Sequence, residues 1–116
     1  MSAFAESLLR LNRIPGVRGS MIVAAEDGLV VEADLMIGIP GPAVAALAAS
    51  LFRGARRSLA EASLGDASFL QLEAEGGYLF AAAPPVGDLM LAVVSDDRVN
   101  VGMLRLKAAA VAETLG

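Results

Sequence analysis

The stretch that decides the fold is residues 42–64, PAVAALAASLFRGARRSLAEASL. Pro42 suits the first turn of a helix, where its missing N–H costs no hydrogen bond. Alanine dominates the stretch, and no β-branched residue follows Val44. Such a composition favours helix over strand. The segment Pro42–Leu64 is therefore predicted to be one long helix in the middle of the chain.

Two apolar stripes lie side by side on this predicted helix. The first is predicted to face the core of its own chain and contains Val44, Leu47, Ala48, Leu51, Ala55, Leu59 and Ala62. The second consists of Ala45, Ala49 and Phe52, and its small side chains would let another helix backbone approach closely. A helix that is apolar over more than half of its circumference has to bury two sides. We expect the second stripe to face another chain, and burial within one domain is the alternative.

The residues before this helix predict a helix and a hairpin. Phe4, Leu8 and Leu11 recur on one helical face, and Pro15-Gly16 ends that helix. Two short apolar runs follow, 20–24 and 29–33, joined by Glu26-Asp27-Gly28. An Asp-Gly pair supplies the positive φ that tight hairpin turns require. This part of the sequence predicts an antiparallel pair of strands.

The residues after the long helix predict three strands and a last helix. The strand Ser68–Ala74 alternates apolar and polar residues, 78–83 follows a Gly-Gly turn, and 89–94 has no polar position. A strand without a polar side is central in its sheet and covered on both faces. Ser95, Asp96 and Asp97 are candidate caps for the final helix. The order αββαβββα predicts a single domain over 1–116, an α+β three-layer α/β/α sandwich with a five-stranded antiparallel sheet.

The composition points to a partner chain. Hydrophobic residues make up 56% of the 116 residues and 12 glycines come in addition, against about 45–50% for both together in ordinary domains. This surplus favours a surface that a second chain buries. The net charge of −4 argues against nucleic acid. No uncharged stretch is long and regular enough for a membrane helix and the N-terminus does not resemble a signal peptide, so we expect a cytoplasmic protein without a membrane partner.

The sequence offers few residues that could act in catalysis. The chain has neither His nor Cys, which excludes His-based triads, thiol catalysis and the usual zinc sites. No phosphate-binding loop motif occurs. The carboxylates are placed where turns and caps need them, so we predict no catalytic residue, metal or cofactor. The cluster Arg53, Arg56 and Arg57 either solvates an apolar helix or forms a docking surface for an acidic partner.

Four motifs in this order resemble the Roadblock/dynein light chain family. They are Leu11–Gly19 (L…IPGVxG), Asp27-Gly28 through Val31 (DGxxV), the strand 89–94, and Asn100 through Arg105 (NxGxxR). The resemblance implies the Roadblock/profilin-like fold and a homodimer in which the middle helix packs on its symmetry mate and strand Ser68–Ala74 pairs across the two-fold axis. The dimer interface expected from it comprises Ala45, Ala49, Phe52, Arg56, Phe69, Gln71 and Glu73. The partner-binding residues expected are Arg53, Arg56 and Arg57.

The same resemblance implies a function. Bacterial Mgl-type members bind a Ras-like small GTPase and accelerate its hydrolysis, whereas eukaryotic members are scaffolds. We therefore expect a non-catalytic homodimeric platform that binds and regulates a bacterial Ras-like small GTPase. A pure scaffold without effect on GTP hydrolysis is one alternative. A small-molecule sensor is the other, although short segments rich in Ala leave little room for a pocket.

Overall fold

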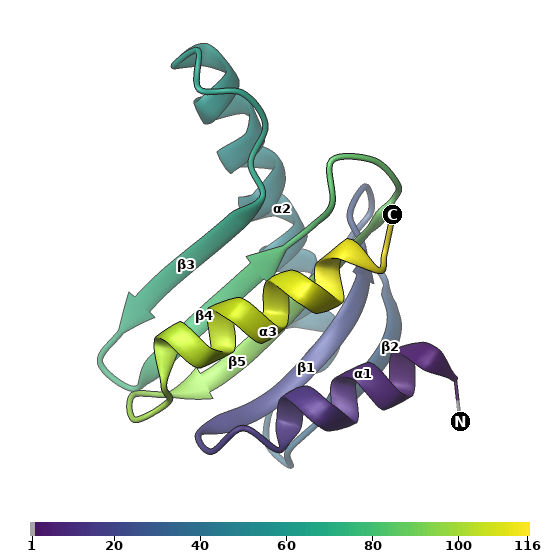
Figure 1. Cartoon of the computed structure of the whole chain (residues 1–116), viewed down its shortest axis with the longest axis vertical. Helices are drawn as coiled ribbons and strands as arrows, with labels where there is room; N and C mark the ends of the chain where they lie inside the picture. The colour runs from purple at the N-terminus through teal and green to yellow at the C-terminus, as the bar shows by residue number, and fades with distance from the viewer. Residues whose placement is uncertain (1) are drawn as a thin grey trace.

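The computed structural model describes residues 2–116 and shows a sheet of five antiparallel strands with three helices. The spatial order of the strands is β2-β1-β5-β4-β3, so β5 is central and β2 and β3 form the two edges (Figure 1). The elements in chain order are α1 (Ala3–Asn12), β1 (Val17–Ala24), β2 (Val30–Leu35), α2 (Gly41–Glu61), β3 (Phe69–Ala74), β4 (Gly77–Ala82), β5 (Leu89–Asp96) and α3 (Val101–Glu113). The predicted three-layer fold, the element order and the central strand are confirmed.

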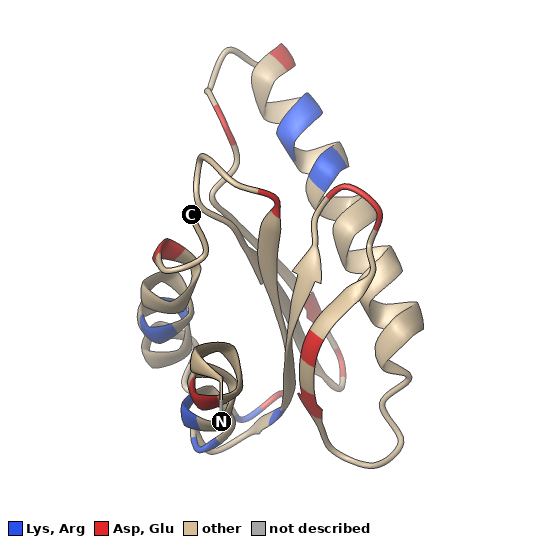
Figure 2. Cartoon of the chain, turned by 90° about the vertical axis from the view of Figure 1, so that its right-hand side faces the viewer, with Lys and Arg blue, Asp and Glu red and all other residues tan. Residues whose placement is uncertain are grey.

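The helices divide unequally between the two faces of the sheet. Viewed along its edge, the sheet carries α1 and α3 on one face and α2 alone on the other (Figure 2). Each face has its own apolar core. The core under α1 and α3 includes Leu8, Leu11, Phe80 and Leu104. The core under α2 is built mainly from alanines, with Phe52, Met21 and Met90 as its large side chains.

Local signals in the sequence account for several boundaries. Gly28 has a φ of +75° and the Asp27 carboxylate accepts a hydrogen bond from the Leu29 N–H at 3.2 Å, as a tight turn requires. The predicted cap of α3 is wrong: Asn100 caps that helix by accepting from the Met103 N–H at 3.0 Å. The Asp96 carboxylate instead accepts from the Arg98 N–H within the preceding turn.

The inner face of α2 is the stripe of small residues. Ala45 and Ala49 have no exposed surface and Phe52 has 1%, and all three pack in the core beside Ala81 and Ala92 of the sheet. Small side chains on both layers let the helix backbone come close to the sheet. The prediction that Ala45, Ala49 and Phe52 form a dimer interface is therefore wrong, because their own sheet already covers them.

The end of α2 also differs from the prediction. The helix ends at Glu61 rather than Leu64, and Ser63 and Gly65 follow with positive φ values of 61° and 91°. The last turns of α2 project beyond the sheet, so this end of the helix has little of its own chain to pack against (Figure 1).

The turn between β3 and β4 provides a sharp test of the backbone. Gly77 has a φ of +151°, and a Cβ there would lie 1.9 Å from the Ser95 carbonyl oxygen. We expect Gly77→Ala to lower the free energy of unfolding by about 3 kcal/mol or more, because strand backbone must move apart. Denaturant unfolding followed by circular dichroism measures the change.

The neighbouring glycine is the matched control. A Cβ at Gly76 would meet nothing within 4 Å, so Gly76→Ala is expected to stay within about 0.5 kcal/mol of the wild type. Equal losses of stability in the two variants would contradict the β4–β5 register.

Candidate interaction surface

The outer flank of α2 carries large apolar side chains in contact with solvent. Leu47 is 65% exposed and Leu51 is 45% exposed. They follow one another at i and i+4 and so lie on one side of the helix. Both belong to the stripe that was predicted to face the core of its own chain. Within α2, that prediction fails at these two residues, whereas Ala48 is buried and Val44, Ala55 and Leu59 pack against the core.

The sheet beside α2 is left partly bare. Five strands spaced about 4.8 Å apart are roughly 19 Å wide between the outer strand axes, whereas one helix is about 10 Å across. α2 packs mainly on β1, β2 and β5. Leu70 and Leu79 on the α2 side of β3 and β4 are only half-buried, and Leu72 is 39% exposed. We call Leu47, Leu51 and Leu72 the apolar shelf.

The strand at the rim of this shelf, β3, has a free edge in the monomer. It pairs with β4 and with no other strand of the described chain. Phe69 packs in the core on the α3 side, where the Arg105 guanidinium stacks 4.3 Å from its ring centroid. Arg105 also donates a hydrogen bond to Gln71 Oε1 at 3.2 Å. Gln71 and Glu73 are exposed at the edge, where a pairing strand would pass.

The arginine cluster is less free than its sequence suggests. Arg53 Nη1 donates to the Ala25 carbonyl oxygen at 2.6 Å. Arg56 lies 3.1 Å from the Asp66 carboxylate and its guanidinium stacks 4.9 Å from the centroid of Phe52. Arg57 is exposed and makes none of the contacts found for its two neighbours. Of the three residues predicted to bind a partner, two are thus tied to their own chain, and Arg57 is the one whose charge is most available.

Other features of the described residues bear on chemistry. No three acidic, His or Cys side chains among residues 2–116 gather where they could hold a metal ion. In the same range, no helix has the length and apolar character needed to cross a membrane. The expectation of little room for a pocket does not match the surface, because an open groove of about 630 Å³ lies between α1 and α3.

Sequence reasoning missed the shelf because it assigned Leu47 and Leu51 to the core together with the rest of their stripe. The two leucines stay exposed, whereas Ala45, Ala48 and Ala49 meet the sheet. The signal in the sequence that could have identified the shelf is side-chain size. A helix packed closely on a sheet needs small residues at the contact, so the larger residues of a two-sided helix belong to the looser, second contact.

Comparison with known proteins gives relatives in sequence and in structure. Two uncharacterized proteins of Methanocaldococcus jannaschii are similar: MJ1340 is 33% identical over 93% of this chain and 92% of its own length, and MJ0310 is 34% identical over 85% and 84%. Among solved structures, the Roadblock/LC7 domain from Streptomyces avermitilis superposes with a TM-score of 0.85 at 21% identity, covering 97% of this chain and 94% of that one. Myxococcus xanthus MglB superposes with a TM-score of 0.82 at 16% identity over 98% and 94%.

These likenesses agree with the family expected from the four motifs. Residues 4–95 match the Roadblock/LC7 domain, which spans α1 through nearly all of β5. The chain therefore belongs to the Roadblock/LC7 domain family.

Proposed function

We propose that the protein is a homodimeric platform for a Ras-like small GTPase, and that the dimer forms through α2 and β3. The observation that carries the dimer is the half-covered face of the sheet: two helices, α1 and α3, pack on one face, whereas α2 alone packs on the other and leaves the apolar shelf open. A second copy of α2, related by a two-fold axis, has the size and the apolar flank to fill that space. The edge of β3 then meets its own copy in the antiparallel sense.

The energetics favour an interface that uses both elements. Full burial of an exposed Leu side chain contributes about 1.5–3 kcal/mol. Leu47 is 65% exposed and Leu51 45%, so burying both in each of two chains supplies on the order of 3–7 kcal/mol. Association costs about 4–15 kcal/mol of lost freedom. The two leucines therefore offset only part of that cost, and burial of Leu72 with pairing of β3 has to supply the rest. The border of the proposed interface includes Gln71, Glu73, Phe69 and Arg56.

The dimer interface is tested by placing charge on the shelf. We expect the wild type to be a dimer at micromolar concentration and the double variant Leu47→Glu/Leu51→Glu to be a monomer, because four carboxylates would be buried without partners. Multi-angle light scattering gives the mass, and circular dichroism shows that the variant stays folded. Leu106→Glu, at a position 75% exposed on α3, is the control and should remain dimeric. A wild type that is still monomeric at about 100 µM, well above the micromolar concentration of the main measurement, would contradict the proposal.

The proposed partner follows from the family and from the shape of such a dimer. Two copies of α2 side by side would present one outward surface shared by both chains. The exposed Arg57 of each copy lies on the outward side of its helix, and positive charge there would steer and orient an acidic surface. The fold is that of MglB, and Mgl-type regulation of a Ras-like small GTPase is the role that this likeness supports. The chain supplies docking and no catalytic group, so any effect on hydrolysis would act through the switch segments of the GTPase.

The docking surface is tested with the Ras-like small GTPases of the same genome, each loaded with a fluorescent GTP analogue. We expect one of them to bind the dimer, and Arg57→Glu to weaken that complex by about threefold to tenfold at low salt and less at 0.5 M salt, because exposed charges are screened. Fluorescence anisotropy measures the affinity. Arg10→Glu, on the opposite face of the sheet, is the matched control and should bind like the wild type. Equal binding by Arg57→Glu at low salt would move the docking site away from α2.

A second measurement separates a regulator from a scaffold. Single-turnover hydrolysis of GTP by the bound GTPase accelerates if the platform regulates it. An unchanged rate with intact binding would identify a pure scaffold, the alternative that the family also contains.

A further inference from the structure

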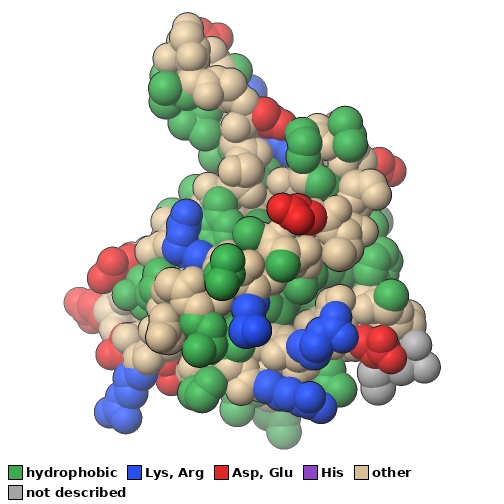
Figure 3. Space-filling view, in the orientation of Figure 1, with side chains coloured by type: hydrophobic (Ala, Val, Ile, Leu, Met, Phe, Trp, Pro, Cys, Tyr) green, Lys and Arg blue, Asp and Glu red, His purple; other side chains and the backbone are tan. Residues whose placement is uncertain are grey.

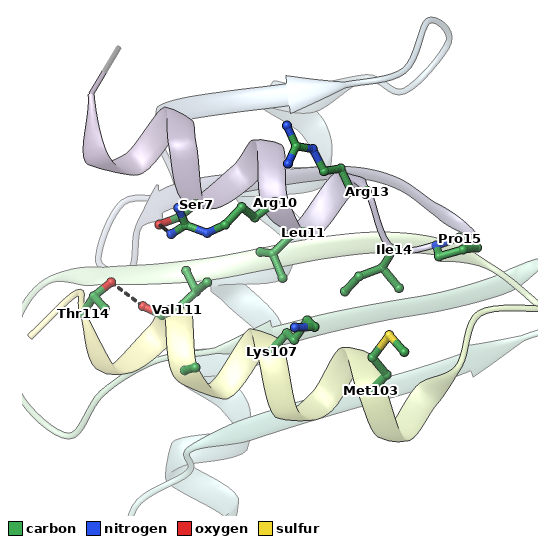
Figure 4. Close-up of a pocket in the computed structure, with 11 residues that line it drawn as sticks. Ser7, Arg10, Leu11, Arg13, Ile14, Pro15, Met103, Lys107, Val111 and Thr114 are labelled. Carbon is green, nitrogen blue, oxygen red and sulfur yellow. Dashed lines mark hydrogen bonds between the residues drawn. The ribbon is translucent and has the colours of Figure 1, made fainter.

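A groove separates α1 from α3 on the face of the sheet opposite to α2. The two helices run antiparallel and form its walls (Figure 4). Its volume is about 630 Å³ and it is partly open to solvent. The lining residues are Ser7, Arg10, Leu11, Arg13, Ile14, Pro15, Met103, Lys107, Ala110, Val111 and Thr114. The proposed dimer, which uses α2 and β3, leaves this groove free in both copies.

The groove combines an apolar floor with basic walls. Leu11 and Ile14 at the floor are almost fully buried, and Val111 is half-buried beside them. Arg10 comes from one wall and Lys107 from the other, so a positive charge borders each side (Figure 4). Arg13 is a third lining residue, and its guanidinium points away from α3 in Figure 4.

The groove is positively charged although the chain as a whole is acidic. The chain carries a net charge of −4, yet none of the residues that line the groove is acidic. Figure 3 shows blue side chains gathered over the lower part of this face among green ones. Arg10 Nη2 has a long bond of 3.4 Å to the Ser7 hydroxyl, and neither Arg10 nor Lys107 forms an ion pair within the described chain.

We propose that this groove binds an amphipathic helix of a protein partner, with apolar residues on its inner face and acidic residues on both flanks. The wall formed by Met103–Thr114 is about 17 Å long, which corresponds to three helical turns. A helix laid in the groove would bury its apolar face on Leu11, Ile14 and Val111, while its carboxylates reach Arg10 and Lys107 from either side. Because the groove is partly open to solvent, an acyl chain in it would stay partly in water, and a helix with a polar outer face fits better. This surface adds a second docking site to the platform and does not depend on the GTPase.

The test uses two synthetic 14-residue peptides with the same leucine face at i, i+3, i+4 and i+7. One carries Glu on both flanks, and the other carries Lys at the same positions. We expect the acidic peptide to bind the wild-type dimer and the basic peptide to bind at least about tenfold more weakly. Fluorescence anisotropy of the labelled peptides gives both affinities.

Paired variants locate the site. Arg10→Glu/Lys107→Glu should weaken the acidic peptide by about tenfold or more, and Arg13→Glu by about twofold, because its guanidinium points away from the groove. Arg98→Glu, at an exposed position outside the groove, is the charge control and should leave the affinity for the acidic peptide unchanged. Ala110→Trp fills the groove without changing charge and should weaken binding by at least about fivefold. Its neighbour Ala109 lines a different groove on the far side of α3, so Ala109→Trp is the control for bulk.

Specific outcomes would overturn the proposal. They are failure of the acidic peptide to bind, equal binding of both peptides, and equal effects of Ala110→Trp and Ala109→Trp. Sedimentation with phosphatidylglycerol vesicles adds a last arm. If the vesicles bind and the acidic peptide does not, the groove serves a lipid surface and the proposal is wrong.

Discussion

The whole arrangement depends on one geometric constraint: a five-stranded sheet is too wide for a single helix to cover. On one face α1 and α3 together cover the sheet, and Leu8, Leu11, Phe80 and Leu104 are buried beneath them. On the other face α2 packs over β1, β2 and β5, and alanines on helix and sheet hold the two layers close together. Close packing strengthens the contact between α2 and the sheet but limits its width, because small side chains do not extend over β3 and β4. Because the side chains at this contact are small, Leu47 and Leu51 on the helix and Leu72 on β3 stay exposed.

Local rules were enough to predict the elements, and they failed where distant parts of the chain meet. Asp27-Gly28, Pro15-Gly16 and the apolar run 89–94 define turns and a central strand by their own conformational preferences. The orientation of α2 could not be fixed in this way, because its two stripes are neighbours on the helix and both are apolar. Which of them faces the sheet depends on the alanines at 81 and 92, which come from strands far along the chain. The same applies to Arg53, whose acceptor is the Ala25 carbonyl oxygen 28 residues away.

The arginines show that a charged side chain predicted from the sequence to bind a partner can already be bound within its own chain. Arg56 joins α2 to Asp66 and to the ring of Phe52, so it holds the segment after α2 against the helix. Arg53 fastens the same helix to the end of β1, where a Cβ at Gly28 would come within 2.9 Å of Ala46 Cα. These contacts fix α2 to segments at the ends of β1, β3 and β4. Two of the three arginines that sequence reasoning assigned to a partner thus hold α2 in place, and Arg57 is left exposed.

The sheet separates two surfaces of different chemistry. The shelf is apolar and lies on the α2 face, whereas the groove between α1 and α3 has an apolar floor and basic walls on the opposite face. The layer between them is the central pair β1 and β5, whose residues from Met21 to Val23 and from Met90 to Val93 have no exposed surface. A well-packed interior of this kind does not deform continuously, so occupation of one surface has no evident route for changing the shape of the other. Binding at the two surfaces should therefore be additive, and a platform with additive sites brings two partners together without requiring either one to switch the other.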